Sequence, residues 1–174
     1  MRLLLAAVAG FICLAPSAAA QEPDPERAAG LWCVYNTLIE NPDDLANVGE
    51  HYYWGVLPEG ETKTLVDGAV EACTSKHKLS AMESFASSQF AQIGGAIDLL
   101  IYDLRFSGAS ATIGKDLLAV LDTLSDDEYD EIFELDWGQG PLGEKLMPLL
   151  LQAGVPAGDE GLMQSAFDLL TLYA

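Results

Sequence analysis

The stretch from Leu79 to Phe106 constrains the fold most, because it combines a clear helix start with the longest helical repeat of apolar side chains in the chain. Ser80 and Glu83 have the spacing of a capping box, in which each side chain accepts a hydrogen bond from the other residue's backbone N–H. Apolar residues then recur at three- and four-residue steps, which places them on one helix face. We therefore predict a central helix over about residues 79–106. The side chains expected to face the core are Met82, Phe85, Ala86, Phe90, Ile93, Ile97, Leu100 and Leu104.

The second half of this predicted helix is apolar on two sides. Leu99, Tyr102 and Phe106 fall opposite the main stripe, so we expect a second layer of the protein to pack on them. The Gly94-Gly95 pair precedes this half, and each glycine costs about 1 kcal/mol relative to alanine inside a helix. The pair predicts either a bend or the close approach of another helix, and we favour close approach.

Helical periodicity and capping signals continue through the rest of the chain, and no convincing strand pattern appears. A first helix begins at Pro25 after an Asp24 cap and ends at Asn41. These patterns predict an all-α fold, a compact bundle of about six or seven helices around the central helix. The other predicted helices cover residues 42–48, 62–76, 112–124, 126–135, 142–153 and 159–173.

Residues 1–20 have the pattern of a secretory signal peptide, with a positive Arg2, an apolar run over 3–14 and a run of alanines ending at Ala20. The apolar run is shorter than the roughly 18–20 residues that span a bilayer. We therefore predict cleavage after Ala20, with no stable membrane insertion afterwards. Residues 21–174 are predicted to form a single acidic, exported domain. The absence of Asn-x-Ser/Thr sites fits a bacterial periplasm better than an extracellular location.

The charge of the predicted mature chain is strongly negative. Loss of Arg2 reduces the eight Lys and Arg to seven, against 27 Asp and Glu, which gives a formal charge of −20. Such a field repels nucleic acid and anionic lipid, and attracts cationic proteins. We predict no nucleic-acid partner and leave two interpretations open, a cationic protein partner or a charge that only keeps the protein in solution.

The predicted mature chain keeps two cysteines, Cys33 and Cys73, because Cys13 leaves with the signal. In an oxidising compartment an even pair predicts a disulfide, here between the first helix and the helix at 62–76. Closing a loop of about 40 residues stabilises the fold by about 4 kcal/mol in the chain-entropy account. The same cysteines with His51 and His77 have zinc-binding side chains. No short Cys or His ligand pair supports that alternative, so we predict no metal and no cofactor.

Motifs for catalysis are absent from the sequence. There is no Gly-x-Ser-x-Gly, no phosphate loop and no His-Glu-x-x-His. Gly138, Gly140 and Gly143 have the Gly-x-Gly-x-x-Gly spacing, but no strand pattern precedes them as a dinucleotide site requires, so we predict no catalytic residues. The acidic cluster at 126–136 lacks the alternating Asp pattern and the turn glycine of a calcium loop, and a solvated helix face is expected there. With 27 acidic residues, some carboxylate pair is always available to a hydrolase acting on envelope or carbohydrate substrates. The presence of such a pair therefore neither supports nor excludes that function.

The densest aromatic cluster is His51-Tyr52-Tyr53-Trp54. These side chains form either a contact for a partner or a plug that closes one end of the helical core. The preferred functional prediction is a non-enzymatic protein-interaction or inhibitor-type module, and the alternative is the carboxylate-dependent hydrolase. A buried carboxylate with a raised pKa beside this cluster would favour the hydrolase, whereas a flat acidic face without a cleft would favour the module.

Overall fold

The computed structural model describes residues 24–133 and 137–174, and this part of the chain is helical without a strand. The predicted all-α fold is confirmed, whereas the signal peptide at 1–20 lies outside the described residues. None of the described helices is both long and apolar enough to cross a membrane. The helices are α1 (Pro25–Leu31), α2 (Cys33–Leu38), α3 (Pro42–Tyr53), α4 (Gly60–His77), α5 (Ala81–Phe106), α6 (Ile113–Leu121), α7 (Asp126–Glu131), α8 (Pro141–Ala153) and α9 (Glu160–Tyr173), with a 3₁₀ turn at Trp137–Gln139.

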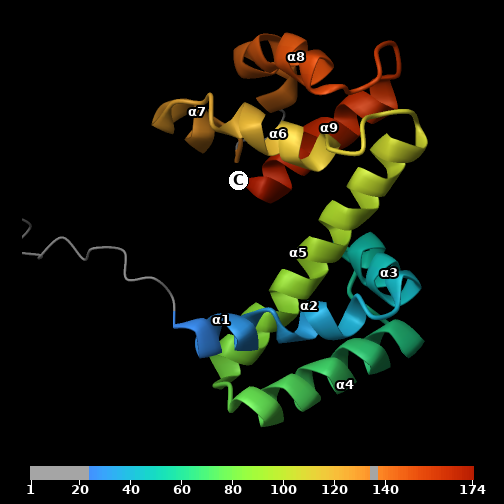
Figure 1. The fold of residues 1–174 in the computed structure, drawn as a ribbon, viewed down its shortest axis with the longest axis vertical. Coiled ribbons are helices and arrows are strands. Elements are labelled where there is room, and N and C mark those ends of the chain that lie inside the picture. Colours follow the sequence, from blue (N-terminus) through green and yellow to red (C-terminus); the bar gives the residue numbers. More distant parts are fainter. Residues whose placement is uncertain (1–23, 134–136) are drawn as a thin grey trace, which may run out of the picture.

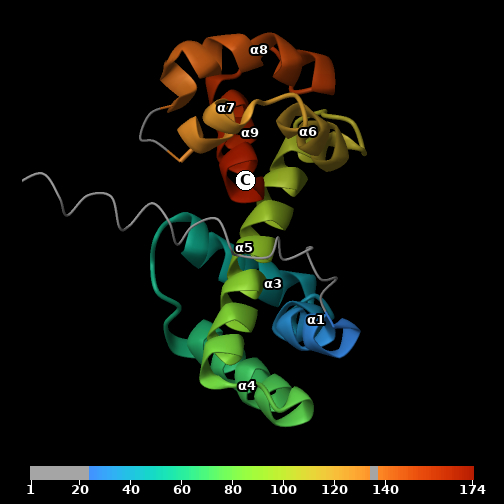
Figure 2. The same ribbon diagram turned by 90° about the vertical axis from the view of Figure 1, so that its left-hand side faces the viewer.

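The long helix α5 is the axis of the molecule, as predicted. Helices α1–α4 surround its first half, and α6–α9 gather around its other end (Figures 1 and 2). Each end has its own cluster of buried apolar side chains, one built around Val34, Leu38 and Val48, the other around Leu104 and Leu146. The prediction that residues 21–174 form one domain stays a prediction.

The predicted start of α5 is confirmed in atomic detail. The backbone N–H of Ser80 donates to the Glu83 carboxylate at 2.9 Å, and the N–H of Glu83 donates to the Ser80 hydroxyl at 3.3 Å. Asp24 caps α1 in the same manner, since its carboxylate accepts from the N–H of Glu26 at 3.0 Å. The capping box thus satisfies the backbone N–H groups of Ser80 and Glu83 at the start of α5 without help from the rest of the fold.

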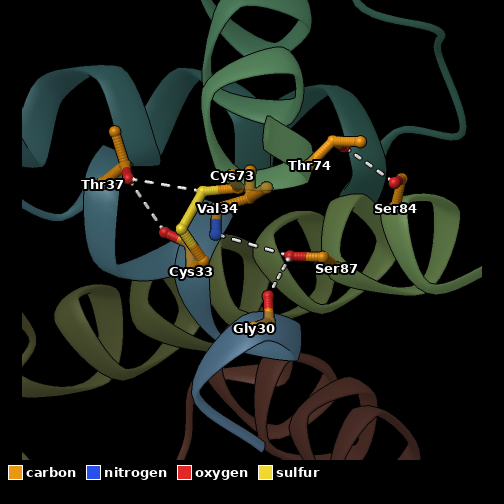
Figure 3. Close-up of a disulfide and its surroundings, with 8 residues drawn as sticks. All are labelled: Gly30, Cys33, Val34, Thr37, Cys73, Thr74, Ser84 and Ser87. Carbon is orange, nitrogen blue, oxygen red and sulfur yellow. Dashed lines mark hydrogen bonds between the residues drawn. A yellow bond between two sulfur atoms is a disulfide. The ribbon is translucent and has the colours of Figure 1, made fainter. Parts of the chain in front are cut away.

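The predicted first helix is divided in two at Trp32, so the described residues place eight α-helices around α5 where the sequence predicted six or seven. In a continuous helix the N–H of Val34 would donate to the carbonyl of Gly30. Instead, the buried Ser87 of α5 lies between them: Val34 N–H donates to its hydroxyl at 3.4 Å, and that hydroxyl donates to Gly30 at 3.2 Å (Figure 3). A side chain inserted into the helical hydrogen-bond ladder interrupts the helix.

The predicted disulfide is confirmed. Cys33 of α2 and Cys73 of α4 are joined with an Sγ–Sγ distance of 2.08 Å and a Cα–Cα distance of 5.8 Å, and both residues are buried (Figure 3). Thr37, one turn further along α2, donates from its hydroxyl to the carbonyl of Cys33 at 2.9 Å. The bridge fastens two helices that pack beside the first half of α5.

The predicted close approach at the glycine pair is also confirmed. A Cβ on Gly95 would lie 2.7 Å from the carbonyl oxygen of Leu45, and a Cβ on Gly49 would lie 2.2 Å from the carbonyl carbon of Gly95. Helices α3 and α5 therefore meet backbone to backbone. Gly94 leaves room for the ring of Tyr35, which a Cβ there would meet at 2.7 Å.

One prediction about α5 is wrong. Met82, Phe85 and Phe90 were expected in the core, but all three are exposed, and the buried side of this part of α5 includes Ser87, Ala91 and Gly95. Small side chains allow the helices around α5 to approach closely, so the packing selects the small face over the large one.

Candidate interaction surface

An apolar groove lies between the start of α3 and the second half of α5. Its volume is about 580 Å³. Two carboxylates, Asp43 and Asp98, stand among its otherwise apolar walls, and among the described residues no lysine or arginine lines it. The apolar lining residues are Ile39, Pro42, Leu45, Ala46, Leu99 and Tyr102.

The apolar surface continues beyond the groove along α5. Tyr102 is 63% exposed and Phe106 is 82% exposed, and their rings stack with centroids 6.1 Å apart. We expected a second layer of the protein on this side, and that prediction is wrong for the part of the chain that the structure describes. The chain turns after Phe106, and α6 to α9 pack instead around Leu100 and Leu104. We call the groove together with Tyr102 and Phe106 the groove face.

The carboxylates of the groove face are held in place by different means. Asp98 accepts a hydrogen bond from the hydroxyl of Tyr35 at 2.7 Å. The pKa of Tyr35 is raised by burial, then by this hydrogen bond and by the negative charge of Asp98. Asp43 is exposed in the first turn of α3, where a negative charge interacts favourably with the helix dipole. The groove thus offers two negative charges at its edges and no compensating positive one.

The residues of the aromatic cluster have different environments, and Tyr52 is partly buried. His51 contacts the carbonyl of Asn47 through Nδ1 at 2.8 Å. The hydroxyl of Tyr53 donates to Asp168 of α9 at 2.6 Å, which fastens α3 to the far end of the molecule. Trp54 is 69% exposed, with its ring 5.2 Å from that of Tyr53. Tyr53 is thus part of the packing between α3 and α9. Contact of the aromatic cluster, residues 51–54, with a partner stays a prediction.

Burial raises the pKa of Tyr53 to about 12, together with the hydrogen bond to Asp168 and the charges of Asp168 and Asp103. A phenol shifted in this direction stays protonated near neutral pH. Its role is therefore that of a hydrogen-bond donor between α3 and α9.

The four residues considered for zinc binding, Cys33, His51, Cys73 and His77, are not arranged as a set of ligands. Cys33 and Cys73 are bonded to each other, and the described residues contain no group of three or more His, Cys, Asp or Glu arranged to hold a metal ion. On α7, Glu128 pairs with Lys145 and accepts a hydrogen bond from the backbone N–H of Ser125, and these contacts lower the pKa of Glu128 to about 2. Residues 134–136 of the acidic cluster lie outside the described part.

The described residues show neither of the two geometries named above: a groove is present where a flat acidic face would favour the module, and the buried carboxylate that would favour a hydrolase is not found. Ser87 is the single buried polar side chain among them, so none of the described carboxylates is buried. The pKa of Glu83 is lowered, chiefly by hydrogen bonds from Ser80, and that of Glu128 is also lowered. A general acid for neutral pH needs the opposite shift.

Part of the groove face was visible in the sequence. Leu99, Tyr102 and Phe106 form a second apolar stripe, which periodicity alone identifies. The sequence pattern did not reveal the α3 wall of the groove, because Pro42 and Ala46 indicate only that a helix begins there. Their position against α5 follows from the glycine contact at Gly49, which requires the folded structure.

Comparisons of the chain with protein-family models, with curated proteins and with solved structures find no match. The feature of this protein that points to a function is the groove face, which combines an apolar groove, two exposed stacked rings and carboxylates at its edge.

Proposed function

We propose that this protein is an exported, non-enzymatic protein-binding module, which acts as an inhibitor where its partner is an enzyme or a toxin. The groove face is the contact surface. Export to the periplasm is part of the proposal and depends on the signal pattern at 1–20.

The observation that supports this proposal best is the continuous apolar surface on one side of α5. Single exposed apolar side chains are ordinary on protein surfaces. Here Leu99, Tyr102 and Phe106 follow one another along a helix face and adjoin a groove whose other wall is also apolar. Removing apolar area from water stabilises an association by about 25 cal/mol per Å² before the costs of binding. Contiguous apolar surfaces of this kind mark sites where another molecule binds.

The charge of the protein favours a cationic partner. The predicted mature chain has a formal charge of −20, and the groove face itself carries Asp43 and Asp98. Complementary charge increases the association rate and excludes acidic competitors, an effect that weakens as salt concentration rises. The apolar groove would then provide affinity, while the carboxylates provide selectivity.

Photo-crosslinking tests this proposal. A photoreactive amino acid would replace Tyr102 in the exporting cell, and Phe133, which is 61% exposed on α7's side of the molecule, would be replaced as a matched control. We expect a protein adduct from position 102 that position 133 does not form, with a yield that falls as salt is raised before irradiation. Equal adducts from both positions, or none from position 102 in the folded and oxidised protein, would contradict the proposal.

A further inference from the structure

The groove face of this protein resembles half of a helix–helix packing surface. Its walls are the sides of α3 and α5, and its floor contains the buried Leu45. Tyr102 and Phe106 are one helical turn apart and expose their stacked rings along the same side of α5. The available contacts therefore run along a helix axis, as they do where a third helix packs against a pair.

The backbone chemistry of the groove also favours a helical occupant. The backbone N–H and C=O groups in the middle of α3 and α5 are engaged within their own helices. An extended peptide in this groove would leave its own backbone groups without partners, whereas a helix satisfies them internally. An apolar stripe on such a helix would then bury Leu99 and Tyr102.

The negative charges on both sides of the groove favour positively charged residues on the two sides of the bound helix. Asp43 stands on the α3 wall and Asp98 on the α5 wall. Asp98 already accepts from Tyr35, but a carboxylate has further acceptor positions. Lysine or arginine side chains beside an apolar stripe would reach both edges, since their long apolar stems pack against the walls while their charged ends meet the carboxylates.

We propose that the groove face binds one amphipathic α-helix of a second exported protein, with an apolar stripe that enters the groove and Lys or Arg on its flanks. This inference depends on the proposed function and adds the chemical class of the partner. An anionic membrane surface does not fit the same charges, because the carboxylates of the groove repel it.

Binding of synthetic peptides to the full protein, purified in its oxidised form from an exporting host, tests this inference. The probe is a labelled peptide of about 18 residues, long enough for a helix, with Leu at helical spacing and Lys elsewhere. One comparison peptide has the same composition in scrambled order, and another replaces Lys by Glu. We expect fluorescence anisotropy to show affinity for the Leu/Lys helix about tenfold or more above that for either comparison peptide, decreasing as salt is raised.

Variants connect the binding to the groove. Tyr102→Ala removes an exposed aromatic anchor, and we expect it to weaken binding about tenfold, whereas Phe133→Ala, at a side chain of similar exposure, leaves binding unchanged. Asp43→Asn should weaken binding at low salt by roughly threefold. Asp126→Asn is its matched control, because Asp126 is also an exposed acid in a first helical turn.

The outcomes separate the two proposals. Equal binding of the ordered and scrambled peptides, or equal binding to the wild type and Tyr102→Ala, would overturn the helix inference while a crosslinked protein at position 102 still supports the proposed function. A dimer of the free protein that Tyr102→Ala dissociates would also overturn it, since the occupant would then be a second copy of this chain. Absence of a crosslinked protein removes the proposed function itself.

Discussion

Adding one methyl group at Gly49 tests whether the contact between α3 and α5 determines the fold of the first half of the molecule. In Gly49→Ala, the new Cβ would lie 2.2 Å from the carbonyl carbon and 2.3 Å from the carbonyl oxygen of Gly95. Non-bonded carbon atoms prefer separations of about 3.5–4.0 Å, so the two helices must move apart by more than about 1 Å. No flexible side chain is present at this point to absorb the shift, because the atoms met are backbone.

Two opposing effects set the size of the change. Overpacking a well-packed site costs about 1–3 kcal/mol, and contact with backbone places this site at the upper end. Alanine returns about 1 kcal/mol of helix propensity relative to glycine. The free energy of unfolding should therefore fall by about 2 kcal/mol, which corresponds to a decrease in melting temperature of about 4–8 °C for a chain of this size.

Gly68→Ala is the matched control. Gly68 lies inside α4, and a Cβ there meets no other atom within 4 Å, so only the propensity gain of up to about 1 kcal/mol applies. Both variants would be unfolded in denaturant and followed by circular dichroism. Opposite signs are expected, and stabilisation of similar size in both would refute the argument that the backbones of α3 and α5 are in contact.

Three further predictions concern single groups. Ser87→Ala should lower the free energy of unfolding by about 1–3 kcal/mol, because two backbone groups lose their partner. Ser165→Ala, which removes only a solvent-exposed hydrogen bond to Gly161, should change it by less than about 0.5 kcal/mol, and equal effects of the two substitutions would contradict this. Replacing Cys33 and Cys73 together by Ala should lower it by about 4 kcal/mol in chemical denaturation, and an unchanged midpoint would contradict that value. Tyr53→Phe should remove a tyrosine that ionises near pH 12 in an absorbance titration. Because an unfolded tyrosine ionises near pH 10, its contribution to stability is complete below about pH 10 and declines toward pH 12; a difference titration centred at pH 10 would refute this.

The features predicted correctly from the sequence are those set by a few neighbouring residues or by simple pairing. The capping box of Ser80 and Glu83 needs only a three-residue spacing, and the glycine pair at 94–95 needs only the cost of glycine in a helix. The disulfide was predicted because just two cysteines remain if the predicted signal peptide is removed. None of these predictions requires knowledge of how the helices pack.

The features that could not be predicted depend on packing between distant segments. Ser87 has no sequence signal that marks it as the residue that divides the first helix, since its partners lie more than 50 positions away. Hydrophobicity favoured Met82 and Phe85 for the core, yet close approach of the surrounding helices requires the smaller Ala91 and Gly95. Periodicity ranks faces by transfer free energy, whereas the folded state also depends on the distance between helix axes.

The same limit explains the groove face. The stripe of Leu99, Tyr102 and Phe106 predicted a covered surface, and periodicity of this kind reports only that a helix face is apolar enough to be buried. It does not say which chain provides the cover. On the other side of α5, helices α6 to α9 cover Leu100 and Leu104, so the pattern there is satisfied within the molecule. Tyr102 and Phe106 carry an equivalent pattern without a covering helix among the described residues, and a helix supplied by a second protein would satisfy it in the same way.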